Sequence, residues 1–145
     1  MKNVLFLVAC LLFSCSVIAD DDRKELGMAG LLSGSNKIDL PEVKLSVGEP
    51  LGGPWTLKSG TYYEVEFTAD GSGEIGLDIS SFSRAVWIDE VVIEGLEIRP
   101  YGGESIEFDD AGTMEIGFVA VKPGKYTIKI PGSKGESQKL DIEIK

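Results

Sequence analysis

The 145-residue chain contains no histidine, and its two cysteines, Cys10 and Cys15, both lie close to the start of the sequence. Imidazole and thiolate are the ligands on which type 1 copper sites depend, and they dominate zinc sites. Nucleophilic catalysis of the Ser-His-Asp or Cys-His type also requires a histidine. The composition therefore argues against these classes of enzyme. We expect no catalytic residues, no cofactor and no enzymatic activity.

Positive charge is also scarce, with 14 Lys+Arg against 24 Asp+Glu and a formal net charge of −10. An acidic surface repels phosphate backbones and anionic membrane faces, so we expect no nucleic-acid partner. The longest apolar stretch, "VLFLVACLLF" at 4–13, is shorter than the roughly 20 residues that a membrane-spanning helix needs. The sequence therefore predicts no membrane span.

The first residues have the pattern of a secretory signal. Lys2 precedes the apolar stretch, and the small residues Val17 and Ala19 follow it. Cleavage after Ala19 is the preferred interpretation, which makes 1–19 a signal peptide. The alternative is a lipoprotein signal in which Cys15 becomes the lipidated first residue. Either way, we expect a periplasmic or secreted protein whose stability rests on a packed core rather than on disulfides.

Residues 20–36 are charged and then rich in glycine and serine, which favours a tether or a short helix. From 37 to 145 the apolar residues recur at every second position, as in strands with one buried face. Asp70-Gly71, Pro123-Gly124 and Pro131-Gly132 are turn signals between such runs. We expect an all-β domain: an antiparallel Greek-key sandwich or barrel of about eight strands.

The alternation also predicts which side chains face inward. Trp87, in the middle of an apolar run, is predicted to fill the space between two sheets. The full predicted core is Val65, Phe67, Leu77, Trp87, Ile106, Phe108, Met114, Ile116, Phe118, Tyr126, Ile128, Leu140 and Ile142.

Three segments, taken in order, resemble the cupredoxin (blue-copper) family: "LKSGTYYEVEFTADG", "FSRAVWIDEVVIEGLEI" and "IEFDDAGTMEIGFVAVKPGKYTIKI". The resemblance covers about 42–145 and implies a cupredoxin-like sandwich. In that family the closing hairpin supplies a cysteine, a histidine and usually a methionine as copper ligands, and a second histidine comes from the middle of the chain. The resemblance would place the cysteine at Ile130, the histidine at Ser133 and the axial methionine near Gly135 or Glu136. The chain therefore resembles the family without carrying its type 1 copper ligands.

Carboxylates are the remaining class of metal ligand. Asp109 and Asp110 lie together in "EFDDAGTME", and Asp89 and Glu90 are adjacent, so these four are the candidates for a weak site for a hard cation such as Ca²⁺. The run "DGSGE" at 70–74 lacks the spacing of a calcium loop and is better interpreted as a turn.

Exposed loop residues are the candidates for binding a partner. Trp55 in "GGPWT" and Tyr101 in "RPYGG" are aromatic residues in loops rich in glycine and proline. For Trp55 and Tyr101 we also consider packing over the end of the barrel. Ser133 and Glu136, in the loop that corresponds to the family's ligand loop, complete the set.

These observations favour an exported, cupredoxin-like binding or accessory module, whose partner would be another exported protein. Two alternatives remain open. One is a metal-binding protein that uses carboxylates to hold Ca²⁺ or another hard cation. The other is a copper protein whose ligands are completed by a partner chain.

Overall fold

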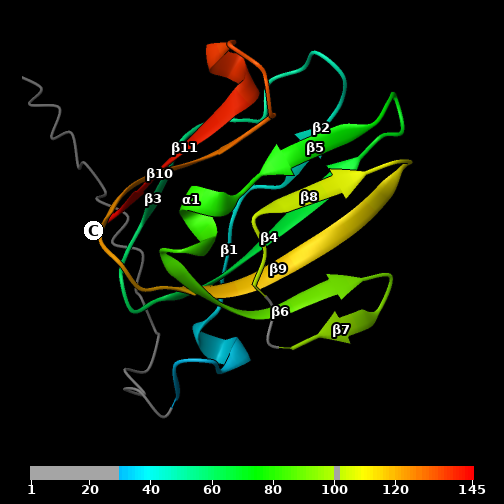
Figure 1. Cartoon of the computed structure of the whole chain (residues 1–145). Helices are drawn as coiled ribbons and strands as arrows, with labels where there is room; N and C mark the ends of the chain where they lie inside the picture. Colours follow the sequence, from blue (N-terminus) through cyan, green and yellow to red (C-terminus); the bar gives the residue numbers. More distant parts are fainter. Residues whose placement is uncertain (1–29, 100–101) are drawn as a thin grey trace, which may run out of the picture.

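The computed structural model describes residues 30–99 and 102–145. Strands dominate this part of the chain, and the one α-helix within it is a single turn (Figure 1). The elements are η2 (Gly34–Asn36), β1 (Ile38–Asp39), β2 (Val43–Leu45), β3 (Trp55–Leu57), β4 (Tyr62–Ala69), β5 (Ile75–Asp78), α1 (Ser80–Ser83), β6 (Val86–Ile93), β7 (Leu96–Ile98), β8 (Ser105–Phe108), β9 (Gly112–Ala120), β10 (Gly124–Lys129), η3 (Glu136–Gln138) and β11 (Lys139–Ile144).

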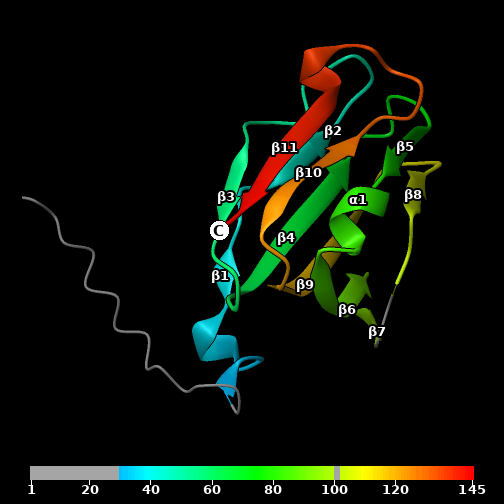
Figure 2. The same cartoon turned by 60° about the vertical axis from the view of Figure 1, so that its left-hand side comes forward.

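Two sheets form the layers of a sandwich. The first, called sheet A here, has the order β1-β4-β9-β6-β7, with β2 also paired to β4. The second, sheet B, has the order β3-β11-β10-β5-β8. In two views 60° apart, the β6–β7 hairpin lies at one end of the molecule and β3, β10 and β11 lie at the other (Figures 1 and 2). The predicted all-β sandwich is confirmed.

The structure adds two features to that prediction. There are eleven strands in the described residues rather than about eight, because several expected runs divide into short pieces. Three of the pairings at the sheet margins are parallel, those of β1 and β2 with β4 and that of β3 with β11, while the other pairings are antiparallel. Short, parallel additions at the edges therefore complete a mainly antiparallel framework.

The core lies between the sheets and follows the predicted alternation in most strands. Val65, Phe67, Leu77, Ile116 and Phe118 are all at most 1% exposed. Other predicted core residues are also buried, namely Met114, Ile128, Leu140 and Ile142. Ile106, Phe108 and Tyr126 are partly buried against this cluster. Period-two alternation thus identifies the inward face correctly in these strands.

Helix α1 fills the core where β5 ends. Its Phe82 is fully buried and lies edge-on to Phe118, with ring centroids 4.9 Å apart. The turn begins at Asp78, whose Oδ1 accepts hydrogen bonds from the backbone N–H and the hydroxyl of Ser80. These hydrogen bonds hold the pKa of the Asp78 carboxyl below its ordinary value, because they favour the charged form.

The placement of the two tryptophans differs from the expectations. Trp87 lies on β6 with half of its surface exposed, so its assignment to the core is wrong. It is paired with Val119 on the outer side of sheet A, because the inward-facing positions of β6 are Val86 and Ile88 before the bulge and Val91 and Ile93 after it. Trp55, expected in a loop, lies in β3 and is only 5% exposed. Packing, the alternative considered for Trp55, is what the structure shows.

The predicted export signal at 1–19, including Cys10 and Cys15, lies outside the described residues. Of the predicted tether, only 30–36 is described, and it contains the short helix η2. Among the described residues, no helix is long and apolar enough to cross a membrane.

Candidate binding surface

The loop in which the sequence resemblance places the copper-ligand positions joins β10 to β11. Ile130 packs partly buried against the core cluster. Ser133 is exposed, and its hydroxyl oxygen accepts a hydrogen bond from the backbone N–H of Gly135 at 3.2 Å. Glu136 is 88% exposed and forms an ion pair with Lys139 at 2.9 Å. Ser133 and Glu136 are therefore solvent-facing, and the structure does not bring them together with the other predicted site residues.

The acidic candidates separate into two places. Asp109 lies beside Glu74 and Glu107, with one carboxylate oxygen of each within 4.8 Å of the others. The side-chain hydrogen bond to Glu74 and the charge of Glu74 raise the pKa of the Glu107 carboxyl. Asp110 is exposed and is not part of this group. The antiparallel pairing of β5 with β8 makes the group, since Ile75 faces Phe108 across the sheet.

The segment "DGSGE" forms the turn that the sequence predicts. Asp70 Oδ1 accepts a hydrogen bond from the backbone N–H of Ser72 at 2.8 Å, the usual Asx-turn arrangement. Glu74 ends this segment, and the sequence does not single it out as a metal ligand. Its neighbours Glu107 and Asp109 are more than thirty positions away in the chain, so the sequence gives no local signal for the grouping.

Asp89 and Glu90 belong to an ion-paired cluster on the outer side of sheet A. Arg99 pairs with Glu90, with Asp89 at 3.3 Å and with Glu97 at 3.0 Å. The hydroxyl of Tyr62, which is 4% exposed, donates to Glu90 Oε1 at 3.2 Å and approaches Asp89 Oδ2 at 3.4 Å. Burial, reinforced by these two carboxylates, raises the pKa of Tyr62 far above its ordinary value.

This cluster explains why Asp89 and Glu90 do not offer a free pair of carboxylates to a cation. Each is only 15% exposed at its side chain, and each already has a guanidinium and a phenol as partners. The cluster instead fixes β7 to β6 across the outer face of the sheet. Glycine at 117 makes room for it, because a Cβ there would lie 2.7 Å from the Tyr62 hydroxyl oxygen.

The inner side of the same hairpin is apolar and open. Two rows of paired residues cross sheet A on its core-facing side. In one row the exposed fraction rises from 1% at Val65 and 0% at Ile116 to 2% at Val91 and 37% at Ile98.

In the other row, the exposed fraction rises from 0% at Phe67 and 6% at Met114 to 43% at Ile93 and 65% at Leu96. Sheet B covers both rows over β4 and β9 but no longer covers them at the end of β6 and at β7. We call Ile93, Leu96 and Ile98 the apolar shelf. Sequence reasoning missed it, although the alternation in "VVIEGLEI" marks these three residues as one face.

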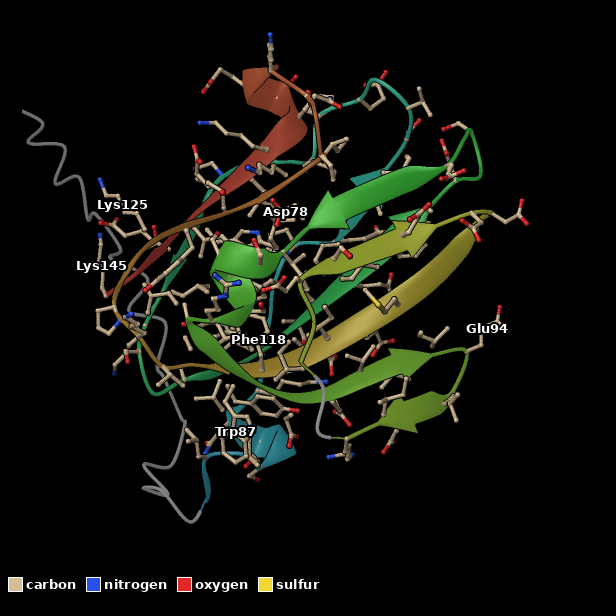
Figure 3. The ribbon with its side chains drawn as sticks, viewed as in Figure 1. Asp78, Trp87, Glu94, Phe118, Lys125 and Lys145 are labelled. Atoms are coloured by element: carbon tan, nitrogen blue, oxygen red, sulfur yellow. The ribbon has the colours of Figure 1, made fainter. Side chains whose placement is uncertain are left out.

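Other exposed apolar residues lie outside the shelf. Trp87 and Val121 are 50% and 53% exposed, and Figure 3 shows Trp87 projecting away from the sandwich. Trp55 borders a shallow hollow of about 580 Å³ on sheet B, together with Pro54, Tyr126 and neighbouring polar side chains. Trp55 is 5% exposed and packs edge-on against Phe82, so little of its surface is accessible to a partner. Tyr101 lies outside the described residues.

No family model matches the chain, and no curated protein matches it in sequence. Solved structures do match its fold. A multicopper oxidase from Pseudomonas thermotolerans has a TM-score of 0.53 and 16% identity, over 77% of this chain and 30% of that one. The copper nitrite reductase from Nitrosomonas europaea has a TM-score of 0.49 and 15% identity, over 66% of this chain and 33% of that one.

At such low identity the similarity concerns the fold alone. The chain spans about a third of the length of these two copper enzymes, and their activities are not carried over with the fold. Together with the two-sheet architecture, the match to the multicopper oxidase identifies this chain as a β-sandwich of the cupredoxin-like fold.

Proposed function

We propose that this protein is an exported, non-enzymatic binding or accessory module that uses a cupredoxin-like scaffold without a type 1 copper site. The observation that carries the proposal is the apolar shelf, an uncovered core-facing surface at one end of the sandwich. Contiguous exposed apolar surface marks sites of interaction with other molecules more often than isolated apolar residues do.

The donor set at the family's copper position supports the second part of the proposal. Ile130 offers no ligand atom, and Ser133 and Glu136 offer only oxygen. Type 1 copper requires a thiolate and two imidazoles, and the chain contains no histidine. These residues do not fit a type 1 copper ion. An apolar side chain at position 130 instead adds to the core without leaving a buried polar atom unpartnered.

The test of the copper claim is the mass of the intact protein recovered from its export compartment. Native mass spectrometry would be recorded before and after addition of Cu⁺, Cu²⁺, Zn²⁺ and Ca²⁺. We expect no stoichiometric copper on the isolated chain. One tightly held copper per chain would overturn the proposal. The same masses distinguish cleavage after Ala19 from lipidation at Cys15.

The binding claim is tested by site-specific cross-linking in the source organism. A photoreactive residue replaces Leu96 in one variant and Val47 in a control, because Val47 is equally apolar and 59% exposed but lies outside the shelf. We expect a discrete cross-linked product with another exported protein from position 96 and none from position 47. Equal products, or none at position 96, would contradict a binding role for the shelf.

A second function is favoured by the grouping of Glu74, Glu107 and Asp109, which could hold a hard cation between β5 and β8. A bound cation would raise the melting temperature in proportion to the logarithm of its concentration. We would compare Ca²⁺ titrations of the parent and of Glu107→Gln. A rise in melting temperature that Glu107→Gln abolishes would favour this second function.

A further inference from the structure

We propose that the apolar shelf accepts an extended segment of a partner protein, which adds to sheet A as a strand beside β7 and carries basic residues alternating with apolar ones. The inference rests on the binding function proposed above and specifies the mode of binding and the chemistry of the partner.

The first argument is the position of β7 in the sheet. It is the last strand of sheet A in the described part of the chain, and its only paired neighbour there is β6. Within the described residues, the side of β7 away from β6 has no strand paired to it, so its backbone groups there are available to an incoming strand.

The second argument is the arrangement of side chains on the hairpin. Leu96 and Ile98 point to the core-facing side of the sheet, and Glu97 points to the outer side. A strand beside β7 with apolar residues at alternate positions would extend the two cross-strand rows and cover the shelf. The residue between those apolar positions would then lie directly opposite Glu97.

Charge determines which residue is favoured opposite Glu97. The outer cluster holds Asp89, Glu90 and Glu97 against the single guanidinium of Arg99, which leaves it with an excess of negative charge. Opposite charges directly across neighbouring strands stabilise their pairing, and like charges destabilise it. Glu94, exposed at the tip of the hairpin (Figure 3), adds a further negative charge. A lysine or arginine is therefore the favoured neighbour of Glu97.

The same charge argues against a second copy of this chain as the occupant. Antiparallel pairing centred on β7 would place Glu97 opposite Glu97 of the other copy, between two chains that each carry a net charge of −10. A separate partner with a basic, alternating segment avoids that repulsion.

The hairpin is already set in the shape needed for such an addition. Glu94 and Gly95 form its two-residue turn with φ of 48° and 80°, the left-handed conformations of a type I′ turn. The twist of that turn matches paired strands, and the Arg99 cluster holds β7 against β6 on the outer face. An added strand would therefore meet an edge that is already formed.

The experiment uses the full purified protein and a blocked heptapeptide of alternating lysine and valine. One control peptide contains the same residues in block order, and the other contains alternating glutamate and valine. Fluorescence anisotropy gives the affinity of each peptide. We expect the alternating basic peptide to bind at least about tenfold more tightly than either control. Hydrogen exchange of the amides at 96–98 should slow when this peptide is saturating.

The shelf is then tested with Leu96→Lys and the matched control Val47→Lys. Both positions are more than half exposed, so both variants should fold with unchanged melting temperatures. We expect Leu96→Lys to weaken binding of the alternating peptide at least about tenfold and Val47→Lys to leave it within about twofold.

Three results would overturn the inference. Equal binding of the block and alternating basic peptides would show attraction by charge alone. Unchanged exchange at 96–98 on binding would place the peptide elsewhere. A dimer of the free protein that Leu96→Lys dissociates would assign the shelf to a second copy. Stoichiometric copper on the isolated chain would instead overturn the proposed function, whatever the peptides do.

Discussion

The hairpins β6–β7 and β10–β11 have the same apolar alternation but different surroundings. In β10–β11, Ile128, Leu140 and Ile142 are at most 2% exposed. In β6–β7, the corresponding residues are those of the apolar shelf, which are 37–65% exposed. Strands β10 and β11 lie inside sheet B, between β3 and β5, whereas β7 ends sheet A. Alternation therefore tells which face of a strand is apolar, and position in the sheet determines whether that face is covered.

The largest change in the free energy of unfolding should come from truncating a buried isoleucine, compared with an exposed isoleucine in the other hairpin. Ile142→Ala removes a fully packed side chain and leaves a cavity, so we expect a loss of about 2–5 kcal/mol in the free energy of unfolding. Ile93→Ala is the matched change at a position that is 43% exposed, and its cost should be below about 1.5 kcal/mol. Urea denaturation measures both. Equal losses would show that the shelf is as well packed as the core.

A smaller effect is expected from Gly117, which lies beneath the outer cluster of the β6–β7 hairpin. In Gly117→Ala the new methyl group would lie 2.7 Å from the Tyr62 hydroxyl oxygen and about 3.1 Å from the side chain of Glu90. The phenol must move, and its hydrogen bond to Glu90 is lost. We expect a destabilisation of about 1–3 kcal/mol, measured by thermal unfolding.

Gly112→Ala is the control for this change, because it lies on the same strand with open space around its Cβ position. It should alter the free energy of unfolding by less than about 1 kcal/mol. If both variants lose the same stability, the Tyr62 contact is not the cause. Tyr62→Phe then isolates the hydrogen bond, because it keeps the ring over Gly117.

The predictable part of this fold is the part that local pattern determines. The runs around Val65 and Ile116 gave strands with the correct inward face, and Asp70-Gly71 gave a turn. The wrong predictions concern residues whose environment depends on elements distant in the sequence. Trp87 has the sequence of a core residue, but the bulge between Ile88 and Glu90 shifts the inward phase of β6, which leaves Trp87 on the outer face.

The candidate site was less predictable than the fold for the same reason. Asp109 meets Glu74 only because β5 pairs with β8, and Asp89 meets Arg99 only because β7 folds back on β6. The shelf depends on where sheet B stops, which no residue of β6 or β7 encodes. Trp55 shows the converse case: a residue in a segment rich in glycine and proline is buried because β11 pairs with it.

The smallest effect should come from Glu115, on the outer side of sheet A beside β6. Burial, together with the charges of Glu64 and Glu66, raises the pKa of its carboxyl. Glu66 lies directly opposite it on β4. A carboxyl whose pKa is raised in the folded state stabilises the fold fully only below its ordinary, unfolded-state pKa, near pH 4. That contribution is lost as the pH rises through the folded-state pKa.

Glu115→Gln removes the charge and keeps the shape of the side chain. We therefore expect the variant to be more stable than the parent by about 0.2–1 kcal/mol at pH 7, with the difference disappearing below about pH 4. Urea denaturation at the two pH values measures it. Since salt screens the repulsion from Glu64 and Glu66 but not the effect of burial, a gain that persists in about 1 M NaCl assigns the shift to desolvation. A variant less stable than its parent at pH 7 would mean that the Glu115 carboxylate has a favourable partner on this face. Repulsion between the carboxylates on the outer face beside β6 would then not destabilise the fold.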